Sequence, residues 1–387
     1  MSVEVQTPAA RVMRRPDMPR QRGEPPAEHR DAARRRRLTL IRRGAVTTWA
    51  IVIVYRTLTE GVAFNRELVL AYIATGLVAA SIGRRNILVV VRDWLPFAVV
   101  LLVYDVSRGA ATFVGTPTLW RWQIDVDRWM FFGNAPTVWL QEQLKLADPP
   151  WWEVVISTVY MSFFVLPYVV AGVLWLRDRE DWKAFVRRFV ALSFAALAIY
   201  IVLPAAPPWA AARCTSGDIV GGPANPACML GAPQGVPGGG LLGSMHSAQP
   251  GANQFVERIS TRGWETLHLH VARDLVNSAQ VSVNMVAAIP SLHAALAAMV
   301  AAFLWRRVRR RWRPLLAAYV LMMAFTLVYS AEHYVIDILL GWALAAVVLA
   351  VVGRFESRRS APTPEPQPTR HEYEVELRRQ LTGASHH

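Results

Sequence analysis

Long apolar runs alternate with short polar connections along most of the chain. Because a helix needs about 20 mostly apolar residues to cross a bilayer, these runs predict membrane-spanning helices. Charged residues interrupt the first and third runs, and intramembrane charges usually face a bundle interior or reach to an interface. The expected spans are approximately 44–62, 66–82, 87–106, 153–176, 186–204, 288–306, 314–330 and 333–352. The predicted fold class is therefore an all-α polytopic membrane protein with about eight transmembrane helices.

The composition supports this fold class and narrows the choice of partners. Of the 387 residues, 53% are hydrophobic, 18% are charged and 15 are tryptophan, which is unusual for a soluble globular chain. The formal net charge is +14, but the arginines cluster at the ends of apolar runs instead of between exposed aromatic residues along one face. This distribution favours a membrane bilayer as partner and argues against nucleic acid.

The basic clusters also predict the orientation in the membrane. They fall on alternate connections, as the positive-inside rule requires of cytoplasmic segments. The clusters are Arg34–Arg37, Arg84–Arg85, Arg177–Arg188, Arg306–Arg313 and Arg354–Arg359. We therefore expect a multi-pass protein of the plasma membrane with both termini in the cytoplasm.

This pattern divides the chain into an N-terminal arm, a transmembrane domain and a C-terminal tail. Residues 1–43 are rich in Pro and Arg and contain hardly any large aliphatic side chains, so they cannot bury a core and predict a disordered, basic cytoplasmic arm. Residues 44–353 form the transmembrane domain, which would also be the catalytic domain. Residues 354–387 are charged and rich in Pro, and are expected to form a cytoplasmic tail.

Two long connections, 107–152 and 205–287, fall on the extracytoplasmic side of this arrangement. The second contains both cysteines of the chain, Cys214 and Cys228. Two cysteines confined to one extracytoplasmic loop predict a disulfide bond, because disulfides persist in oxidising compartments. Closing this ring would stabilise the loop by about 3 kcal/mol in the loop-entropy account.

Two short polar turns carry the candidate chemistry. His293 follows Pro290 and Ser291 at the predicted start of one helix, and His333 stands at the start of another. Both turns are expected at one depth on the extracytoplasmic side. Asp337 lies four residues after His333, so on a helix it would share a face with the histidine and accept a ring N–H. Ser291 could cap the helix or bind a phosphate oxygen beside the exposed N–H groups of the helix start.

Two histidines in this setting suit phosphoryl transfer. One can attack phosphorus while the other protonates the leaving oxygen. The alternative interpretation is structural, because a Pro-Ser pair is ordinary helix capping and a His-x-x-x-Asp pair at an interface can be a satisfied polar contact. The presence of both features on one side of the membrane favours the catalytic interpretation.

The sequences Pro290–His293 and His333–Asp337 resemble the second and third signature motifs of the type 2 phosphatidic acid phosphatase superfamily. Within it they are most similar to the branch that contains inositol phosphorylceramide synthase and sphingomyelin synthase. The resemblance implies a six-helix catalytic core and chemistry without a metal or another cofactor. It also implies that His333 forms a phosphohistidine, that Asp337 orients this nucleophile, and that His293 protonates the leaving alcohol.

The chain departs from the phosphatase branch of this family. It lacks a first motif with Lys and Arg-Pro, and Leu327–Ser330 stands where a Ser-Arg pair would precede the third-motif histidine. These departures favour the transferase branch and leave the cationic clamp for the phosphate unassigned. Arg108, at the expected end of the third helix, is the candidate for this substrate-binding role. The alternative is an arginine side chain that only reaches to the membrane interface.

The predicted function is transfer of a phospho-headgroup from a phospholipid donor to a lipid or glycan alcohol on the extracytoplasmic side. The resemblance suggests inositol phosphate as the headgroup. One alternative is a phosphatase for lipid or polyprenyl phosphates, because water and alcohols can both release a covalent phosphoenzyme. A second alternative is a non-catalytic lipid-binding or transport protein.

Overall fold

A computed structural model describes most of the chain between residues 27 and 360. The described ranges are 27–60, 66–84, 86–108, 114–230, 236, 238–267 and 285–360. The first 26 residues of the predicted arm and the predicted tail beyond 360 lie outside them.

Each of the eight predicted spans coincides with a helix, which confirms the all-α fold class. The long helices are α1 (Ala27–Glu60), α2 (Arg66–Ser81), α3 (Ile87–Arg108), α7 (Trp151–Arg177), α8 (Arg179–Val202), α11 (Leu292–Trp305), α12 (Arg313–Tyr329) and α13 (Val335–Ser360). Six helices in the described ranges are long and apolar enough to cross a membrane, whereas α2 and α11 are shorter apolar helices. The protein is therefore a multi-pass membrane protein, and the sequence-based count of eight spans stays a prediction.

The basic arm differs from the sequence-based expectation. Residues 27–43 were expected to be disordered, but α1 begins at Ala27 and continues without a break into the apolar run. Ala, Arg and Glu are good helix formers, and adding residues to an existing helix costs far less than starting a new one. Residues 27–43 thus form the first part of α1, and the division of the chain into arm, transmembrane domain and tail stays a prediction.

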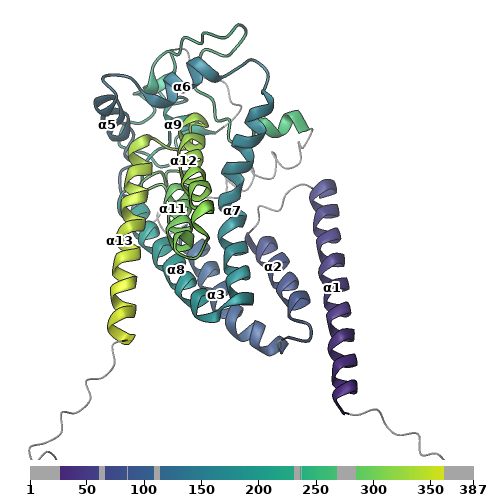
Figure 1. Ribbon diagram of the computed structural model, residues 1–387. Coiled ribbons are helices and arrows are strands. Elements are labelled where there is room, and N and C mark those ends of the chain that lie inside the picture. Colours follow the sequence, from purple (N-terminus) through teal and green to yellow (C-terminus); the bar gives the residue numbers. More distant parts are fainter. Residues whose placement is uncertain are drawn as a thin grey trace, which may run out of the picture.

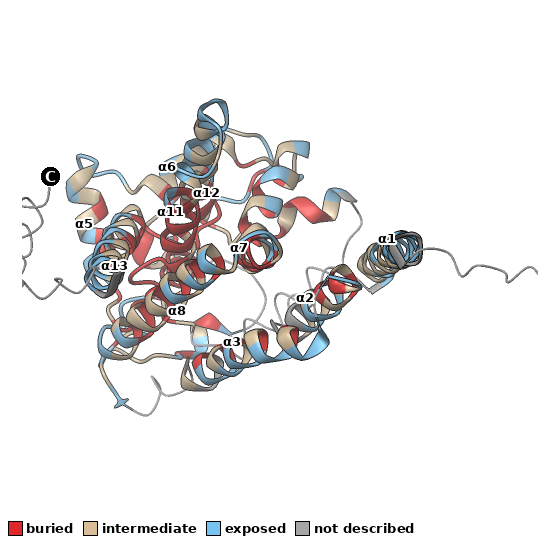
Figure 2. Ribbon diagram, turned by 60° about the horizontal axis from the view of Figure 1, so that its bottom comes forward, coloured by how far each residue is buried: buried red, intermediate tan, exposed pale blue. Residues whose placement is uncertain are grey.

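Helix α11 lies at the centre of the bundle, with α7, α8, α12 and α13 around it (Figure 2). Its sequence is rich in alanine, and small side chains let helices approach closely where no water drives them together. Nine of its residues are buried, so this short helix forms part of the core instead of facing lipid. Helices α3, α2 and α1 follow one another outward from one side of this group (Figures 1 and 2).

The predicted extracytoplasmic connections form a cap of short helices over one end of the bundle (Figure 1). The cap contains α5 (Trp122–Met130), α6 (Pro136–Leu144), α9 (Pro208–Ala211) and the 3-10 turns Ala227–Met229, Gly240–Leu242 and Arg262–Leu267. A further 3-10 turn, Arg310–Trp312, precedes α12 at the opposite end. The structure also contains the predicted disulfide, with the Cα atoms of Cys214 and Cys228 5.3 Å apart.

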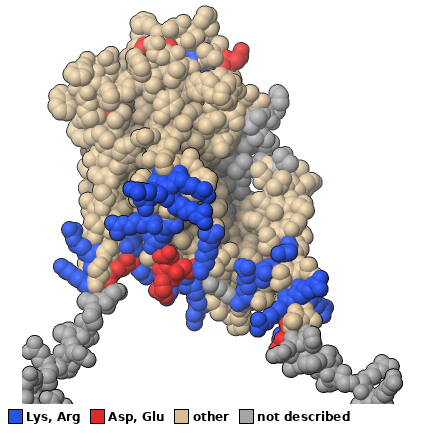
Figure 3. Space-filling model, in the orientation of Figure 1, with Lys and Arg blue, Asp and Glu red and all other residues tan. Residues whose placement is uncertain are grey.

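The two ends of the molecule differ in charge. In the view of Figure 3, Lys and Arg gather at the end opposite the cap, where the connections between long helices lie. At that end Glu356 of α13 accepts hydrogen bonds from Arg187 and Arg188 of α8, at 2.8 and 2.6 Å. This contact holds the extension of α13 beyond the predicted end of its span at residue 352.

Candidate active site

The structure brings the two predicted histidine turns together at the cap end of the bundle. The ring centroids of His293 and His333 are 5.5 Å apart. The turns are also bonded to each other through the backbone, because the N–H of Ser291 donates to the carbonyl oxygen of Asp337 at 2.9 Å. Tyr200 of α8 donates from its hydroxyl to the carbonyl oxygen of Pro290 at 2.8 Å. The mutual placement of the two histidines is therefore built into the core.

His333 is held through one of its two ring nitrogens. Its Nδ1 lies 3.1 Å from the carbonyl oxygen of Ala288 and 3.5 Å from Oδ2 of Asp337. Because both oxygens can only accept, this geometry assigns the proton to Nδ1 and leaves the lone pair of a neutral ring on Nε2. Asp337 is fully buried, and its Oδ2 also accepts the N–H of Tyr334 at 3.0 Å. This arrangement suits a nucleophile or a general base.

His293 is held by aromatic side chains of α7. Its ring stacks on Tyr160 with centroids 5.1 Å apart and an interplanar angle of 18°, and the centroid of Phe163 lies 3.9 Å away. Phe164 contacts the ring edge-on at 5.9 Å. One stacked ring and two further aromatic contacts restrict the imidazole to a narrow range of orientations.

The two predicted substrate-binding residues have different outcomes. Ser291 is the N-cap of α11 and is fully buried, and its Oγ accepts the N–H of Ala294 at 3.3 Å. The capping part of the prediction is thus observed, and phosphate binding stays a prediction. Arg108 is the last residue of α3, and its side chain lies outside what the structure describes.

A cation that the sequence reasoning missed lies next to both histidine turns. Arg258 donates two hydrogen bonds to the carboxylate of Glu332, at 2.8 and 3.0 Å, and Glu332 directly precedes His333. Arg258 also interacts with Tyr160, the residue that stacks on His293. Burial alone would raise the pKa of Glu332, but the contact with Arg258 outweighs it and the pKa is lowered. The pair is therefore ionised and stands beside the histidines.

Arginine also surrounds Trp209 of α9 at this end of the bundle. The guanidinium carbons of Arg258 and Arg213 lie 4.8 and 5.3 Å from the centroid of the Trp209 ring, a distance typical of cation–π contacts. The backbone N–H of Trp209 donates to the carbonyl oxygen of Ala331 at 3.0 Å, which ties α9 to the turn that leads to His333. Arg213 directly precedes Cys214, so the disulfide anchors the segment that carries it.

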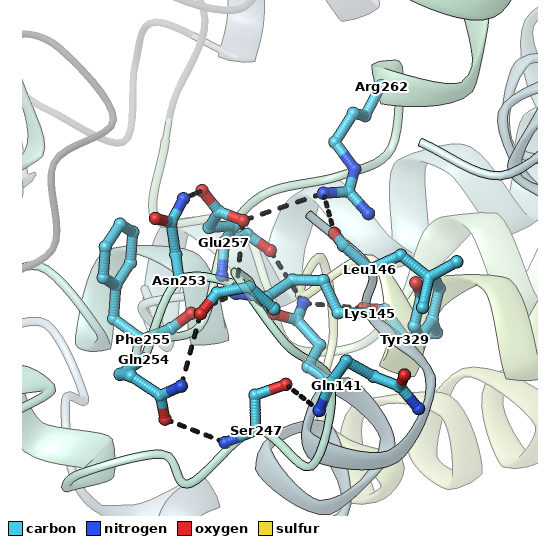
Figure 4. Close-up of polar contacts among 12 residues, drawn as sticks. Gln141, Lys145, Leu146, Ser247, Asn253, Gln254, Phe255, Glu257, Arg262 and Tyr329 are labelled. Carbon is cyan, nitrogen blue, oxygen red and sulfur yellow. Dashed lines mark hydrogen bonds and ion pairs between the residues drawn. The ribbon is translucent and has the colours of Figure 1, made fainter. Parts of the chain in front are cut away.

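Arg258 lies in the segment of residues 253–262, which we call the strap. Gln141 of α6 binds the strap through its side-chain amide, which donates to the carbonyl oxygen of Glu257 at 2.8 Å and accepts the N–H of Glu257 at 2.9 Å (Figure 4). The same amide donates to the carbonyl oxygen of Tyr329 at 2.8 Å. One buried side chain thus ties the residue before Arg258 to the end of α12.

Ionic contacts hold the strap on both sides of Arg258. The ammonium group of Lys145 donates to the carbonyl oxygen of Phe255 at 2.6 Å and lies 3.2 Å from a carboxylate oxygen of Glu257. Burial lowers the pKa of Lys145, although the neighbouring Glu257 opposes this shift. Arg262 pairs with Glu153 of α7 at 2.8 Å. These contacts fix the strap to α6 and α7.

Asp127 of α5 was also missed, although it holds the start of α13. Its Oδ2 accepts the N–H of Val335 at 2.9 Å and its Oδ1 accepts the N–H of Ile336 at 3.0 Å. The first N–H groups of a helix have no partner within the helix, so a side chain from a distant segment caps α13. Burial raises the pKa of Asp127 to about 6, although these two hydrogen bonds lower it.

No group of three or more His, Cys, Asp and Glu residues in the described ranges is arranged to hold a metal ion. Two oriented imidazoles, an ion pair and a helix start with N–H groups can bind an anion and transfer protons next to it.

Comparison with known proteins identifies the family of the chain. Residues 121–351 match the sequence profile of the PAP2 superfamily, and this range contains both histidine turns, the strap and Asp127. The match spans more than half of the chain, so the protein belongs to the PAP2 superfamily. It is a membrane enzyme of the phosphotransferase and phosphatase class with lipid substrates.

One curated relative narrows the comparison further. The chain is 24% identical over 290 residues to the phosphoinositol dihydroceramide synthase of Bacteroides thetaiotaomicron, and the alignment covers 73% of this chain and 81% of the relative. No solved structure matches the chain at a significant level. The sequence-based assignment to the branch that contains inositol phosphorylceramide synthase is confirmed, and the chain is a lipid phosphotransferase.

Proposed function

We propose that the protein transfers inositol phosphate from a phospholipid donor to an acceptor alcohol through a phosphohistidine on His333. The observation that supports this proposal best is the pair of facing imidazoles, in which the Nδ1 atom of His333 is tied to Ala288 and Asp337. Such a ring presents its free Nε2 as a nucleophile. The name of the curated relative supports phosphoinositol as the transferred group.

The reaction would proceed in two steps. In the first, Nε2 of His333 forms a bond to phosphorus, the bond from phosphorus to the lipid oxygen breaks, and His293 gives its proton to the leaving oxygen. In the second, the hydroxyl oxygen of the acceptor attacks phosphorus and the N–P bond breaks. His293 takes the hydroxyl proton and is then ready for another cycle. Asp337 stabilises the charge that His333 develops while the N–P bond exists.

Arg258 is proposed to bind the phosphate oxygens of the donor. Guanidinium groups match the geometry of phosphate oxygens, and Arg258 lies between the residues that hold the two histidines. Arg108 remains a second candidate from the sequence. Replacing each arginine by lysine separates them, because the residue that binds phosphate through two N–H groups should lose turnover even though its charge is kept.

The active site is proposed to face the extracytoplasmic side of the plasma membrane, with both termini in the cytoplasm. The basic clusters gather at the end opposite the site (Figure 3), and the positive-inside rule places such an end in the cytoplasm. The disulfide between Cys214 and Cys228 lies at the site end, and disulfides persist in oxidising compartments. These two observations support the same orientation.

The decisive experiment uses purified protein, phosphatidylinositol labelled in its inositol phosphate, and a lipid alcohol such as ceramide. The proposal predicts a labelled product that contains the acceptor, together with an acid-labile label on the protein that is absent in His333→Ala. In His293→Ala, donors with good leaving groups should be slowed least, because their leaving oxygen needs no proton. Full turnover by His333→Ala would rule out the phosphohistidine.

The same experiment separates the alternatives. A phosphatase would release free phosphate from lipid or polyprenyl phosphates whether or not an alcohol is present. A lipid-binding or transport protein would retain the labelled donor without forming a product, and His333→Ala would not alter binding. A transferase would form the labelled product that contains the acceptor, and it would release less free phosphate to water when the acceptor is present.

A further inference from the structure

An apolar groove lies on the outside of the bundle between α12 and α13, and nothing in the reaction described above uses it. Its volume is about 520 Å³. Ala324 and Val328 of α12 form one wall. Val335, Ile338 and Trp342 of α13 form the other. From Val335 to Trp342 the groove follows two turns of helix, which is about 10 Å at the usual rise per residue.

The groove begins next to the catalytic residues. Val335 is two residues after His333, and Ile338 directly follows Asp337. Ile338 and Val328 belong to the same buried cluster as Tyr160, and Tyr160 stacks on His293. The groove is therefore connected to the histidine pair through one buried cluster of side chains.

The lining of the groove selects hydrocarbon over a polar group. Asn134 is the one amide among the lining side chains, and the others are apolar or aromatic. At the cap end, Phe132 is 97% exposed and Trp139 is 54% exposed. Exposed aromatic side chains typically stand at the boundary between headgroups and hydrocarbon. The upper end of the groove thus lies at headgroup level, close to His333, and its lower end in the hydrocarbon layer.

We propose that this groove holds an acyl chain of the phospholipid donor while its phosphate is at His333. The proposal rests on the proposed function, because a donor whose phosphorus reaches His333 must pass its chains into the bilayer within a few bonds of that residue. The groove offers an apolar path that starts at that level and descends along α13. Binding a chain there would hold the donor in place during the first step.

Photolabelling tests the proposal without requiring turnover. The full-length protein is placed in phosphatidylcholine nanodiscs with phosphatidylinositol that carries a diazirine in one acyl chain. After illumination, the labelled peptides are mapped by mass spectrometry. We expect adducts on α12 and α13 at groove residues, and we expect excess unlabelled phosphatidylinositol to suppress them while added phosphatidylcholine does not.

Two variants make the test specific. Ala324→Trp fills the groove, and we expect groove adducts to fall by about tenfold, which corresponds to excluding two methylene groups. Val347→Trp adds the same side chain to α13 at a position that is 57% exposed and outside the groove lining, and labelling should not change. Thermal unfolding of both variants shows whether Ala324→Trp is still folded. If it is folded, a loss of groove adducts relative to the wild-type map means that the tryptophan fills the groove.

Three results would overturn the proposal. Groove adducts that phosphatidylinositol does not suppress would indicate bulk lipid, and adducts confined to other helices would place the chain elsewhere. Labelling of the groove by a diazirine ceramide alone would assign it to the acceptor. Turnover of the same probe is measured separately. Groove adducts that phosphatidylinositol suppresses, without formation of product, would refute the proposed transferase activity but not acyl-chain binding in the groove. Formation of product with adducts only elsewhere would refute acyl-chain binding in the groove but not the transferase activity.

Discussion

Asp127 contributes to the site through the backbone of α13, because its carboxylate caps the helix that carries the His333 turn and Asp337. Burial raises the pKa of Asp127, and the charge of Asp337 raises it further. A buried carboxylate in this position makes the stability of the folded state depend on pH. Substitution of Asp127 should reveal this dependence.

We predict that Asp127→Asn flattens the pH dependence of thermal stability. The folded-state pKa of about 6 lies above the ordinary value of 3.8, so the folded protein holds this proton more tightly than the unfolded chain does. The stabilisation is complete below about pH 4 and is lost as pH rises through 6, by about 3 kcal/mol in total. Unfolding temperatures measured from pH 4.5 to 7.5 should therefore rise more on acidification in the wild type than in Asp127→Asn.

Asp125→Asn is the matched control for this prediction. Asp125 stands two residues earlier in α5 and is exposed, so its removal should leave the pH profile of the wild type unchanged. Parallel profiles for the wild type and Asp127→Asn would show that Asp127 does not titrate in this range.

Arg258 combines a structural contact with a proposed catalytic one, and paired substitutions can separate the two. Arg258→Gln leaves the carboxylate of Glu332 buried without its partner, which typically destabilises a protein by about 3–5 kcal/mol. In the double variant with Glu332→Gln the uncompensated charge is gone, so most of the stability should return. Turnover should nevertheless stay about 100-fold low or lower, because the charge at the phosphate is still missing. Recovery of both stability and turnover would reduce Arg258 to a structural residue.

At the scale of helices, α11 and α13 approach so closely that one glycine decides their distance. A Cβ atom added to Gly341 of α13 would lie 2.4 Å from the carbonyl oxygen of Ser291, which belongs to the backbone of the His293 turn. The backbone there cannot rotate away, so the helices must separate. The same contact therefore controls packing and the distance between the two histidines.

We predict that Gly341→Ala lowers stability by about 1–3 kcal/mol, as overpacking usually does, and reduces turnover more than substrate binding. Gly353→Ala is the matched control on the same helix, since an added Cβ there meets its nearest neighbour, the guanidinium of Arg188, at 4.0 Å. That control should keep turnover and gain slightly in stability from the higher helix propensity of alanine. Equal effects of both substitutions would argue against the close approach.

The helices and the histidine turns could be predicted from sequence because both signals are local. The length of an apolar run and the four-residue spacing of His333 and Asp337 depend on neighbouring positions. The contacts of Asp127 with α13 join residues 208 and 209 positions apart, and Arg258 is 74 positions from Glu332. No periodicity in the sequence reports such pairs, so the cap's contribution to the site became visible only in the structure.

At the scale of the whole molecule, charge and covalent chemistry point to one orientation. The end with the basic clusters is opposite the cap (Figures 1 and 3), and Cys214 of the disulfide is buried in one cluster with Trp209 and Ala331 at the cap end. The sequence already predicted this opposition, because basic residues and cysteines occupy alternate connections. What the structure adds is that the cap, the strap and the histidine pair all lie at the disulfide end, so the side on which the substrate is bound follows from the orientation of the chain.

Cysteine labelling tests this orientation directly. Asp148→Cys places a thiol on the exposed connection between α6 and α7 at the site end, and Ser357→Cys places one on the exposed opposite end of α13. Both native cysteines are in the disulfide, so each variant carries one reactive thiol. An impermeant maleimide should label Asp148→Cys on intact cells and Ser357→Cys only after permeabilisation. The reverse pattern would place the histidine pair in the cytoplasm, where a reducing environment would not maintain the disulfide that anchors Arg213.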